Sequence, residues 1–60
     1  MLAKKIRLIK AFHNWTNKDL GKFLGLHEMT VIQYQRGVWS PKKLTIEKIN
    51  ELYEEVKNGL

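Results

Sequence analysis

The chain has 60 residues, no cysteine, and eleven Lys and Arg against six Asp and Glu, which gives a net charge of +5. A chain of this size buries only about 60% of its unfolded surface, so we expect one domain, residues 1–60, with a single small core. The lack of cysteine excludes a disulfide framework and a cysteine zinc site, and two histidines are too few for a tetrahedral metal site. We therefore expect neither a metal nor a cofactor.

The basic residues lie mainly in the first two thirds of the chain. Residues 1–43 hold nine basic and two acidic side chains, whereas residues 44–60 hold two basic and four acidic ones. This uneven charge is typical of proteins that bind polyanions, and a merely soluble basic protein is the simpler alternative. No apolar run approaches the roughly 18 residues that cross a bilayer, and the N-terminal segment lacks the features of a secretory signal. We expect a cytoplasmic protein without membrane contact.

The first predicted helix covers residues 2–13. Apolar or aromatic side chains recur there at spacings of four, three and four, on one stripe made of Leu2, Ile6, Ile9 and His13. Asn14 tolerates the left-handed conformation and is expected to end this helix.

The second predicted helix covers residues 17–24. Thr16 is a good N-cap, and Asp19 three residues later completes a variant of the capping box. Gly21 lies in the helix interior, where glycine costs about 1 kcal/mol relative to alanine, and we interpret it as a point of close approach by another helix. The residues expected to point inward are Leu20 and Leu24.

Gly25 is expected to stop the second helix by supplying a positive φ, and Leu26 to plug the core between two helices. The third predicted helix covers residues 28–36. His27 occupies its N-cap position, and Gly37 ends it.

Both sides of this third helix carry apolar residues, so periodicity alone does not identify its core face. Val31 and Tyr34 lie on one side, and the other side consists of Met29, Ile32, Gln33 and Arg36. The spacing of glycine, apolar plug and β-branched residue is that of a helix-turn-helix over residues 17–36. That geometry buries Val31 and Tyr34 and leaves the other side exposed.

A loop containing Pro41 separates the third helix from the fourth, because the residue before a proline prefers an extended backbone. The fourth predicted helix covers residues 45–57, with Thr45 as its cap and Asn58-Gly59 as its end. Its expected buried stripe consists of Ile46, Ile49, Leu52, Tyr53 and Val56. Together the elements predict an all-α, compact domain of four to five helices.

The chain resembles the lambda-repressor-like helix-turn-helix family, which includes phage repressors, Cro (Cro/C1-type) proteins and Xre-type regulators. The resemblance covers residues 2–56 and rests on a set of residues at the family's spacings: Thr16, Leu20, Gly25, Leu26, Val31, Tyr34, Arg36, Gly37 and Pro41. Gly21 stands where the family usually has alanine. Lys10 and Gln35 stand where the family commonly pairs Arg with Glu, so at best one hydrogen bond is expected between them.

The resemblance implies a regulator of transcription, a repressor or Cro-like protein of a phage, plasmid or mobile element, that binds palindromic double-stranded operator DNA as a homodimer. Helix 28–36 would enter the major groove, and the N-terminus of helix 17–24 would meet a phosphate. The residues then expected to contact bases are His27, Glu28, Met29, Ile32 and Gln33. Those expected to contact phosphates are Asn17, Lys18, Thr30, Arg36, Lys42 and Lys43.

The side-chain types suit the groove, because Gln can bind adenine in two places, Glu accepts from cytosine N4, and Met and Ile contact thymine methyls. Simpler roles stay open for several of them. Glu28 can stabilise the helix N-terminus by its charge, Met29 and Ile32 can belong to a protein interface, and Lys42 and Lys43 can be a solvated loop.

Three aromatic residues are not explained by DNA binding. Together with Leu8, the aromatic residues Phe12, Phe23 and Trp39 stand where the core need not extend, and these three are candidates for a protein interface. They favour an alternative function, an antirepressor or accessory module that binds a partner regulator through the same fold. A small core that uses every available aromatic is the simpler interpretation. We expect no enzyme, because the sequence has no nucleophile elbow and no paired acids beside an obvious cleft. The expected location is the cytoplasm, at the nucleoid.

Overall fold

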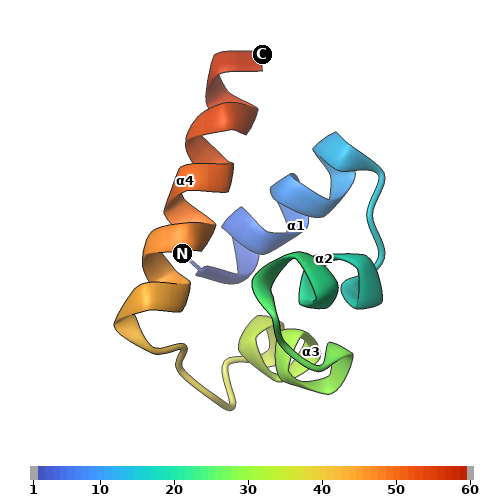
Figure 1. The fold of residues 1–60 in the computed structure, drawn as a ribbon, viewed down its shortest axis with the longest axis vertical. Coiled ribbons are helices and arrows are strands. Elements are labelled where there is room, and N and C mark those ends of the chain that lie inside the picture. The colour runs from blue at the N-terminus through green and yellow to red at the C-terminus, as the bar shows by residue number, and fades with distance from the viewer. Residues whose placement is uncertain (1, 60) are drawn as a thin grey trace.

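Four α-helices form the fold of the computed structural model, which describes residues 2–59 (Figure 1). They are α1 (Leu2–His13), α2 (Asn17–Leu24), α3 (Glu28–Arg36) and α4 (Lys43–Gly59). α4 runs along one side of the molecule, α1 packs across it, and α2 and α3 lie together beside them. Residues 1 and 60, the outermost residues of the predicted domain, lie outside the described part. Within residues 2–59, no helix has the length and apolar character needed to cross a membrane.

The first three helices have the predicted bounds, because local signals fix their ends. Asn14 adopts φ 57°, and Gly25 and Gly37 adopt φ 74° and 76°, so each of these residues ends a helix in the left-handed region. At the start of α2, the Thr16 hydroxyl oxygen accepts from the Asp19 N–H at 3.1 Å. The Asp19 carboxylate accepts in return from the Thr16 N–H at 3.0 Å. The predicted capping box is therefore confirmed.

The predicted bounds of α4 are wrong at both ends. The helix begins at Lys43 and not at Thr45, and the Lys42 carbonyl accepts from the Ile46 N–H at 2.9 Å. Thr45 is therefore inside the first turn and is not the cap. The first N–H groups of a helix can bind water, so a start in an exposed loop needs no side-chain cap.

The C-terminal end of α4 also extends beyond the prediction. Asn58 and Gly59, expected to end the helix, are both helical. The Phe12 ring of α1 lies so close to Gly59 that a Cβ on this glycine would be 2.7 Å from it. Packing of α1 against the end of α4 thus outweighs a weak local stop signal.

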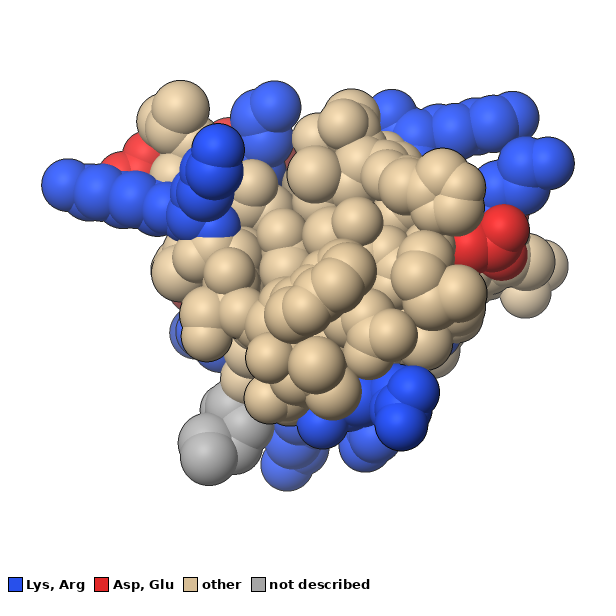
Figure 2. Space-filling view, turned by 90° about the horizontal axis from the view of Figure 1, so that it is seen from below, with Lys and Arg blue, Asp and Glu red and all other residues tan. Residues whose placement is uncertain are grey.

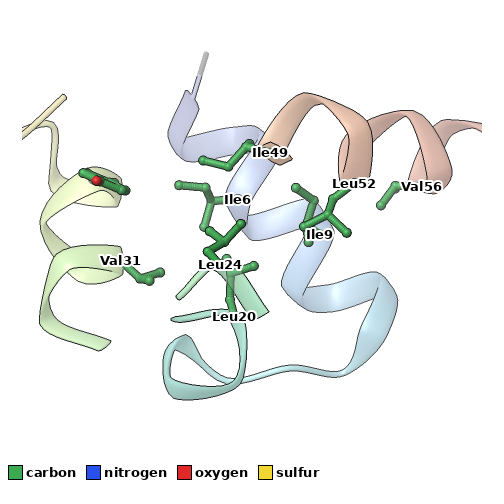
Figure 3. Packing of buried hydrophobic residues seen from close by; sticks show 9 residues of the cluster. Ile6, Ile9, Leu20, Leu24, Val31, Ile49, Leu52 and Val56 are labelled. Carbon is green, nitrogen blue, oxygen red and sulfur yellow. The ribbon is translucent and has the colours of Figure 1, made fainter. Parts of the chain in front are cut away.

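The core lies where all four helices meet. Figure 3 shows Ile6 and Ile9 of α1 between side chains of α2 and α4, with Val31 of α3 pointing toward them. The buried hydrophobic residues that form it are Ile6, Ile9, Leu20, Leu24, Val31, Tyr34, Ile49, Leu52 and Val56. Leu26 packs against this cluster as the predicted plug. Ile46, predicted to be buried, is 38% exposed, because the first turn of α4 borders an open groove instead of the core.

Gly21 marks the closest approach between α2 and the turn that follows it. A Cβ on Gly21 would lie 2.7 Å from the carbonyl oxygen of Leu26, which is too close for two such atoms. The Leu26 N–H also donates to the Gly21 carbonyl at 2.7 Å. The predicted close approach is confirmed, but the partner is the backbone of the turn and not another helix.

Candidate nucleic-acid interface

α3 has one face in the core and one face toward solvent, as the turn at Gly25 predicts. Val31 is 0% exposed and Tyr34 is 8% exposed, and both pack into the core. On the opposite side Met29 is 48% exposed and Arg36 is exposed. The predicted orientation of α3 is confirmed, so its outer face is available to a ligand.

The first turn of α3 is organised by His27. The Nδ1 atom of His27 accepts from the Met29 N–H at 3.0 Å, which confirms His27 as the N-cap. Because Nδ1 is an acceptor, a neutral ring carries its proton on Nε2. His27 and Glu28 are both exposed, so this end of α3 offers a donor from the imidazole and an acceptor from the carboxylate.

The middle of the outer face is less open than the sequence suggests. Thr30, Ile32 and Gln33 are half-buried. The Gln33 Nε2 donates to the Met29 sulfur at 3.7 Å. Gln33 is therefore folded along the helix toward Met29, and its Oε1 accepts from no protein group of residues 2–59.

Asn17 lies at the centre of a hydrogen-bond network that joins three helices. Lys10 Nζ of α1 and Gln35 Nε2 of α3 each donate to Asn17 Oδ1 at 2.7 Å. Gln35 Nε2 also donates to the Val31 carbonyl at 3.2 Å. The hydrogen bond expected between Lys10 and Gln35 does not form. Both side chains instead donate to the same acceptor, Asn17 Oδ1. Sequence reasoning missed the role of Asn17 as that acceptor.

This network fixes how Asn17 is presented. With both donors on its oxygen, the Asn17 amide has its Nδ2 hydrogens on the other side, and within residues 2–59 they donate to no protein group. Burial of the Lys10 ammonium lowers its pKa, and the positive charge of Arg7 one turn away lowers it further. Lys10, which is half-buried, therefore supports Asn17 through the hydrogen bond to Asn17 Oδ1.

Basic side chains surround the α3 side of the molecule. Figure 2, seen from below relative to Figure 1, shows a mainly uncharged centre with Lys and Arg side chains around its rim. The predicted phosphate-binding residues Lys18, Arg36, Lys42 and Lys43 are all exposed. Lys57 and Glu54 form an ion pair on α4 at 3.3 Å, and no ion pair in the described residues involves those four. Their charges are therefore available to a polyanion.

Comparison with known proteins agrees with this arrangement. Over 52 residues the chain is 31% identical to an uncharacterized HTH-type (helix-turn-helix) transcriptional regulator of Methanocaldococcus jannaschii, and the match covers 87% of this chain and 79% of that protein. The chain belongs to the helix-turn-helix-type transcriptional regulators. No family model and no solved structure matches it.

This helix-turn-helix chain also has an aromatic surface away from α3. The rings of His13 and Trp15 are stacked with centroids 4.2 Å apart, and the Trp15 and Phe23 rings lie 5.2 Å apart. Phe12 meets His13 edge to face at 5.1 Å. Phe12 and Phe23 are 45% and 57% exposed, so the predicted interface residues are neither core nor fully solvated. Trp39, the third predicted residue, is 50% exposed and lies in the loop after α3.

No grouping of three or more His, Asp or Glu side chains that could hold a metal ion occurs in the described part of the chain. The residues that come together around α3 are instead hydrogen-bond donors, acceptors, apolar groups and cations. Such a set can recognise a surface by shape, charge and hydrogen bonding.

Proposed function

We propose that this protein is a sequence-specific, double-stranded DNA-binding regulator of transcription, with residues 1–60 as one lambda-repressor-like domain of the Cro/C1 and Xre type. The observation that carries the proposal is the sidedness of α3, with Val31 in the core and Met29 on the surface. An α-helix with one free face fits the major groove of B-DNA. The basic rim and the family to which the chain belongs support the same function.

The phosphate contacts come from both sides of α3. Asn17 offers its Nδ2 hydrogens at the start of α2, where free backbone N–H groups also favour an anion. Lys18 and Thr30 assist there, and three cations hold the backbone at the far end of α3: Arg36, Lys42 and Lys43. These contacts position the protein without reading sequence.

The base contacts come from the outer face of α3. His27 donates from Nε2, Glu28 accepts from a cytosine amino group, and Met29 and Ile32 contact thymine methyls. Gln33 reads adenine. Its unpaired Oε1 supports this role, because adenine presents an N6 donor beside an N7 acceptor and so satisfies both ends of the amide. Reading requires Gln33 to leave Met29 and extend into the groove.

One helix-turn-helix reads only a few base pairs, so we propose that two copies bind a palindromic operator. Occupying an operator blocks polymerase, which makes the protein a repressor or Cro-like regulator of a phage, plasmid or mobile element. Its action is binding without covalent chemistry, and its place is the cytoplasm, at the nucleoid.

Selection of bound sequences from a random double-stranded DNA pool, at two salt concentrations, tests this function. We expect enrichment of a short palindromic site and a steep loss of affinity with salt, because each phosphate contact releases counterions. Failure to enrich any sequence at low salt would contradict the proposal.

A second function is favoured by the exposure of Phe12 and Phe23. This surface suits an antirepressor or accessory module that binds another regulator, since aromatic residues are enriched at protein interfaces. Such a protein would show little salt-dependent DNA affinity and would bind its partner less tightly after Phe23→Ala. A Phe23→Ala variant that binds the partner regulator as tightly as the wild type would rule this function out.

A further inference from the structure

Three helices meet at the side chain of Asn17, the first residue of α2. Lys10 Nζ of α1 and Gln35 Nε2 of α3 both donate to Asn17 Oδ1, each at 2.7 Å. Asn17 is half-buried, and its Nδ2 has no acceptor within residues 2–59 and is not buried. The oxygen of this amide therefore faces the protein, and its N–H groups face solvent.

The amide of Gln35 is itself fixed in one orientation. Its Nε2 donates to the Val31 carbonyl at 3.2 Å as well as to Asn17 Oδ1, so both N–H groups of this amide are used. The opposite orientation would place the Gln35 Oε1 against two acceptors. The backbone of α3 therefore makes position 35 a donor, and that donor makes Asn17 Oδ1 the acceptor.

The start of α2 would be a poor site for an anion without this arrangement. The Asp19 N–H is taken by the Thr16 hydroxyl, and the Asp19 carboxylate puts a negative charge in the first turn. The backbone N–H groups of Asn17 and Lys18 have no acceptor in the described part of the chain. The Lys10 ammonium offsets the carboxylate charge. It also polarises the Asn17 amide, which makes Nδ2 a stronger donor.

We propose that Gln35 and Lys10 are positioning residues for DNA binding, which act by keeping the Nδ2 of Asn17 turned toward a DNA phosphate. Their role rests on the proposed function, in which Asn17 contacts the DNA backbone, and it requires neither side chain to touch DNA. The deciding feature is the hydrogen-bond donor at position 35. An acceptor at this position would turn the Asn17 amide over and present Oδ1 to the phosphate, which has no hydrogen to donate to it.

Two substitutions at position 35 separate the donor from the side chain that supplies it. Gln35→Glu introduces an acceptor of the same shape, so Asn17 Nδ2 should turn inward to donate to the new carboxylate. Gln35→Met is the matched control, because it removes both hydrogen bonds of Gln35 without supplying an acceptor, and Lys10 still donates to Asn17 Oδ1. Circular dichroism of each variant checks that the fold is retained.

Nuclear magnetic resonance of the free protein tests the orientation without DNA. In the wild type and in Gln35→Met, the side-chain N–H groups of Asn17 should exchange with water as those of an exposed amide do. In Gln35→Glu one of them becomes hydrogen-bonded and should exchange about threefold more slowly or less rapidly still, the effect of one ordinary hydrogen bond. Equal exchange in Gln35→Glu and the wild type would overturn the inference.

A double-mutant cycle measures the same dependence in DNA binding, with fluorescence anisotropy and the duplex obtained by selection. Asn17→Ala should weaken binding about tenfold per bound copy in the wild type and in Gln35→Met, the loss of a hydrogen bond to a charged group. In Gln35→Glu it should cost nothing, because Nδ2 is already turned away. The added charge of Gln35→Glu is present with and without Asn17→Ala, so the cycle removes its effect. Equal losses in all three backgrounds would contradict the positioning role of Gln35.

The salt dependence of binding shows whether Lys10 acts through Asn17 or touches DNA itself. Lys10→Met should weaken binding and leave the slope of log affinity against log salt unchanged, because no phosphate contact of Lys10 is lost. Lys18→Met is the control: it removes a proposed phosphate contact and should reduce the slope by about one. The same reduction in Lys10→Met would show that Lys10 is a direct contact and not a positioning residue.

These measurements also separate the positioning roles from the proposed function. Absence of DNA binding by the wild type would refute the proposed function, whatever the exchange rates of Asn17 show. DNA binding by the wild type, with equal losses throughout the cycle, would refute the positioning roles alone.

Discussion

The two faces of α3 carry similar side chains and differ in what they do. Val31 and Ile32 are neighbours in the sequence and are both β-branched, yet Val31 is fully buried and Ile32 lies half-buried on the outer side. The difference comes from the turn at Gly25 and the close contact at Gly21, which set the rotation of α3 against the core. The inner face therefore stabilises the fold, and the outer face is free to be shaped by a ligand.

The largest expected effect follows from removing the contact that sets this rotation. Gly21→Leu forces side-chain atoms into the backbone at Leu26, and we expect a loss of about 3 kcal/mol or more in the free energy of unfolding. Gly25→Ala is the control: it has open space around it and should cost only about 1–2 kcal/mol of backbone strain. Urea unfolding followed by circular dichroism measures both. Equal losses in the two variants would show that the close contact is not what matters.

A smaller effect compares the two faces directly. Val31→Ala removes two buried methyl groups and should lower the free energy of unfolding by about 2 kcal/mol. Met29→Ala, on the outer face of the same helix, should change it by less than about 0.5 kcal/mol. Thermal unfolding measures the pair. A Met29→Ala variant as unstable as Val31→Ala would remove the distinction between the faces.

The outer face should reveal itself in DNA binding. Gln33→Ala should cost about 1–3 kcal/mol at one base position and leave other positions unaffected. Arg36→Ala should weaken all sequences alike and reduce the slope of log affinity against log salt by about one. A scan of base substitutions in the selected site, measured by fluorescence anisotropy, compares the two. Uniform weakening by Gln33→Ala would show that Gln33 does not read a base.

The smallest expected effect concerns the cap that begins α2. Hydrogen bonds from the Thr16 backbone and then from its side chain hold the pKa of Asp19 below its ordinary value. The stabilisation is therefore present above the ordinary pKa of Asp and is lost as the pH falls through the lower folded value. Asp19→Asn should show a shallower decline of melting temperature from neutral to acidic pH. Parallel curves for variant and wild type would contradict this assignment.

The parts of the fold that sequence predicted correctly depend on residues close together in the chain. The ends of the first three helices follow from Thr16, Asn14, His27 and two glycines with positive φ, each acting within a few residues. The bounds of α4 were not predictable in this way. The helix continues through Gly59, which lies against the ring of Phe12, a residue more than forty positions away in the sequence.

The outward side of α3 was predictable from the sequence, and the arrangement of side chains on it was not. The spacing of residues in the turn was enough to identify which side of α3 faces outward. The burial of Val31 and Tyr34 confirms that identification. The sequence could not indicate that Gln33 folds against Met29, because that choice depends on side-chain packing at the surface.

The sequence alone determined four helical segments, the caps and glycine turns that end the first three, and the uneven charge, because these are properties of neighbouring residues. Only the tertiary structure decided that Asn17 accepts from both Lys10 and Gln35, and that a groove forms between Leu2 and Ile46. These features join residues from different helices. Their geometry is set by how the helices pack, which local conformational preferences do not specify.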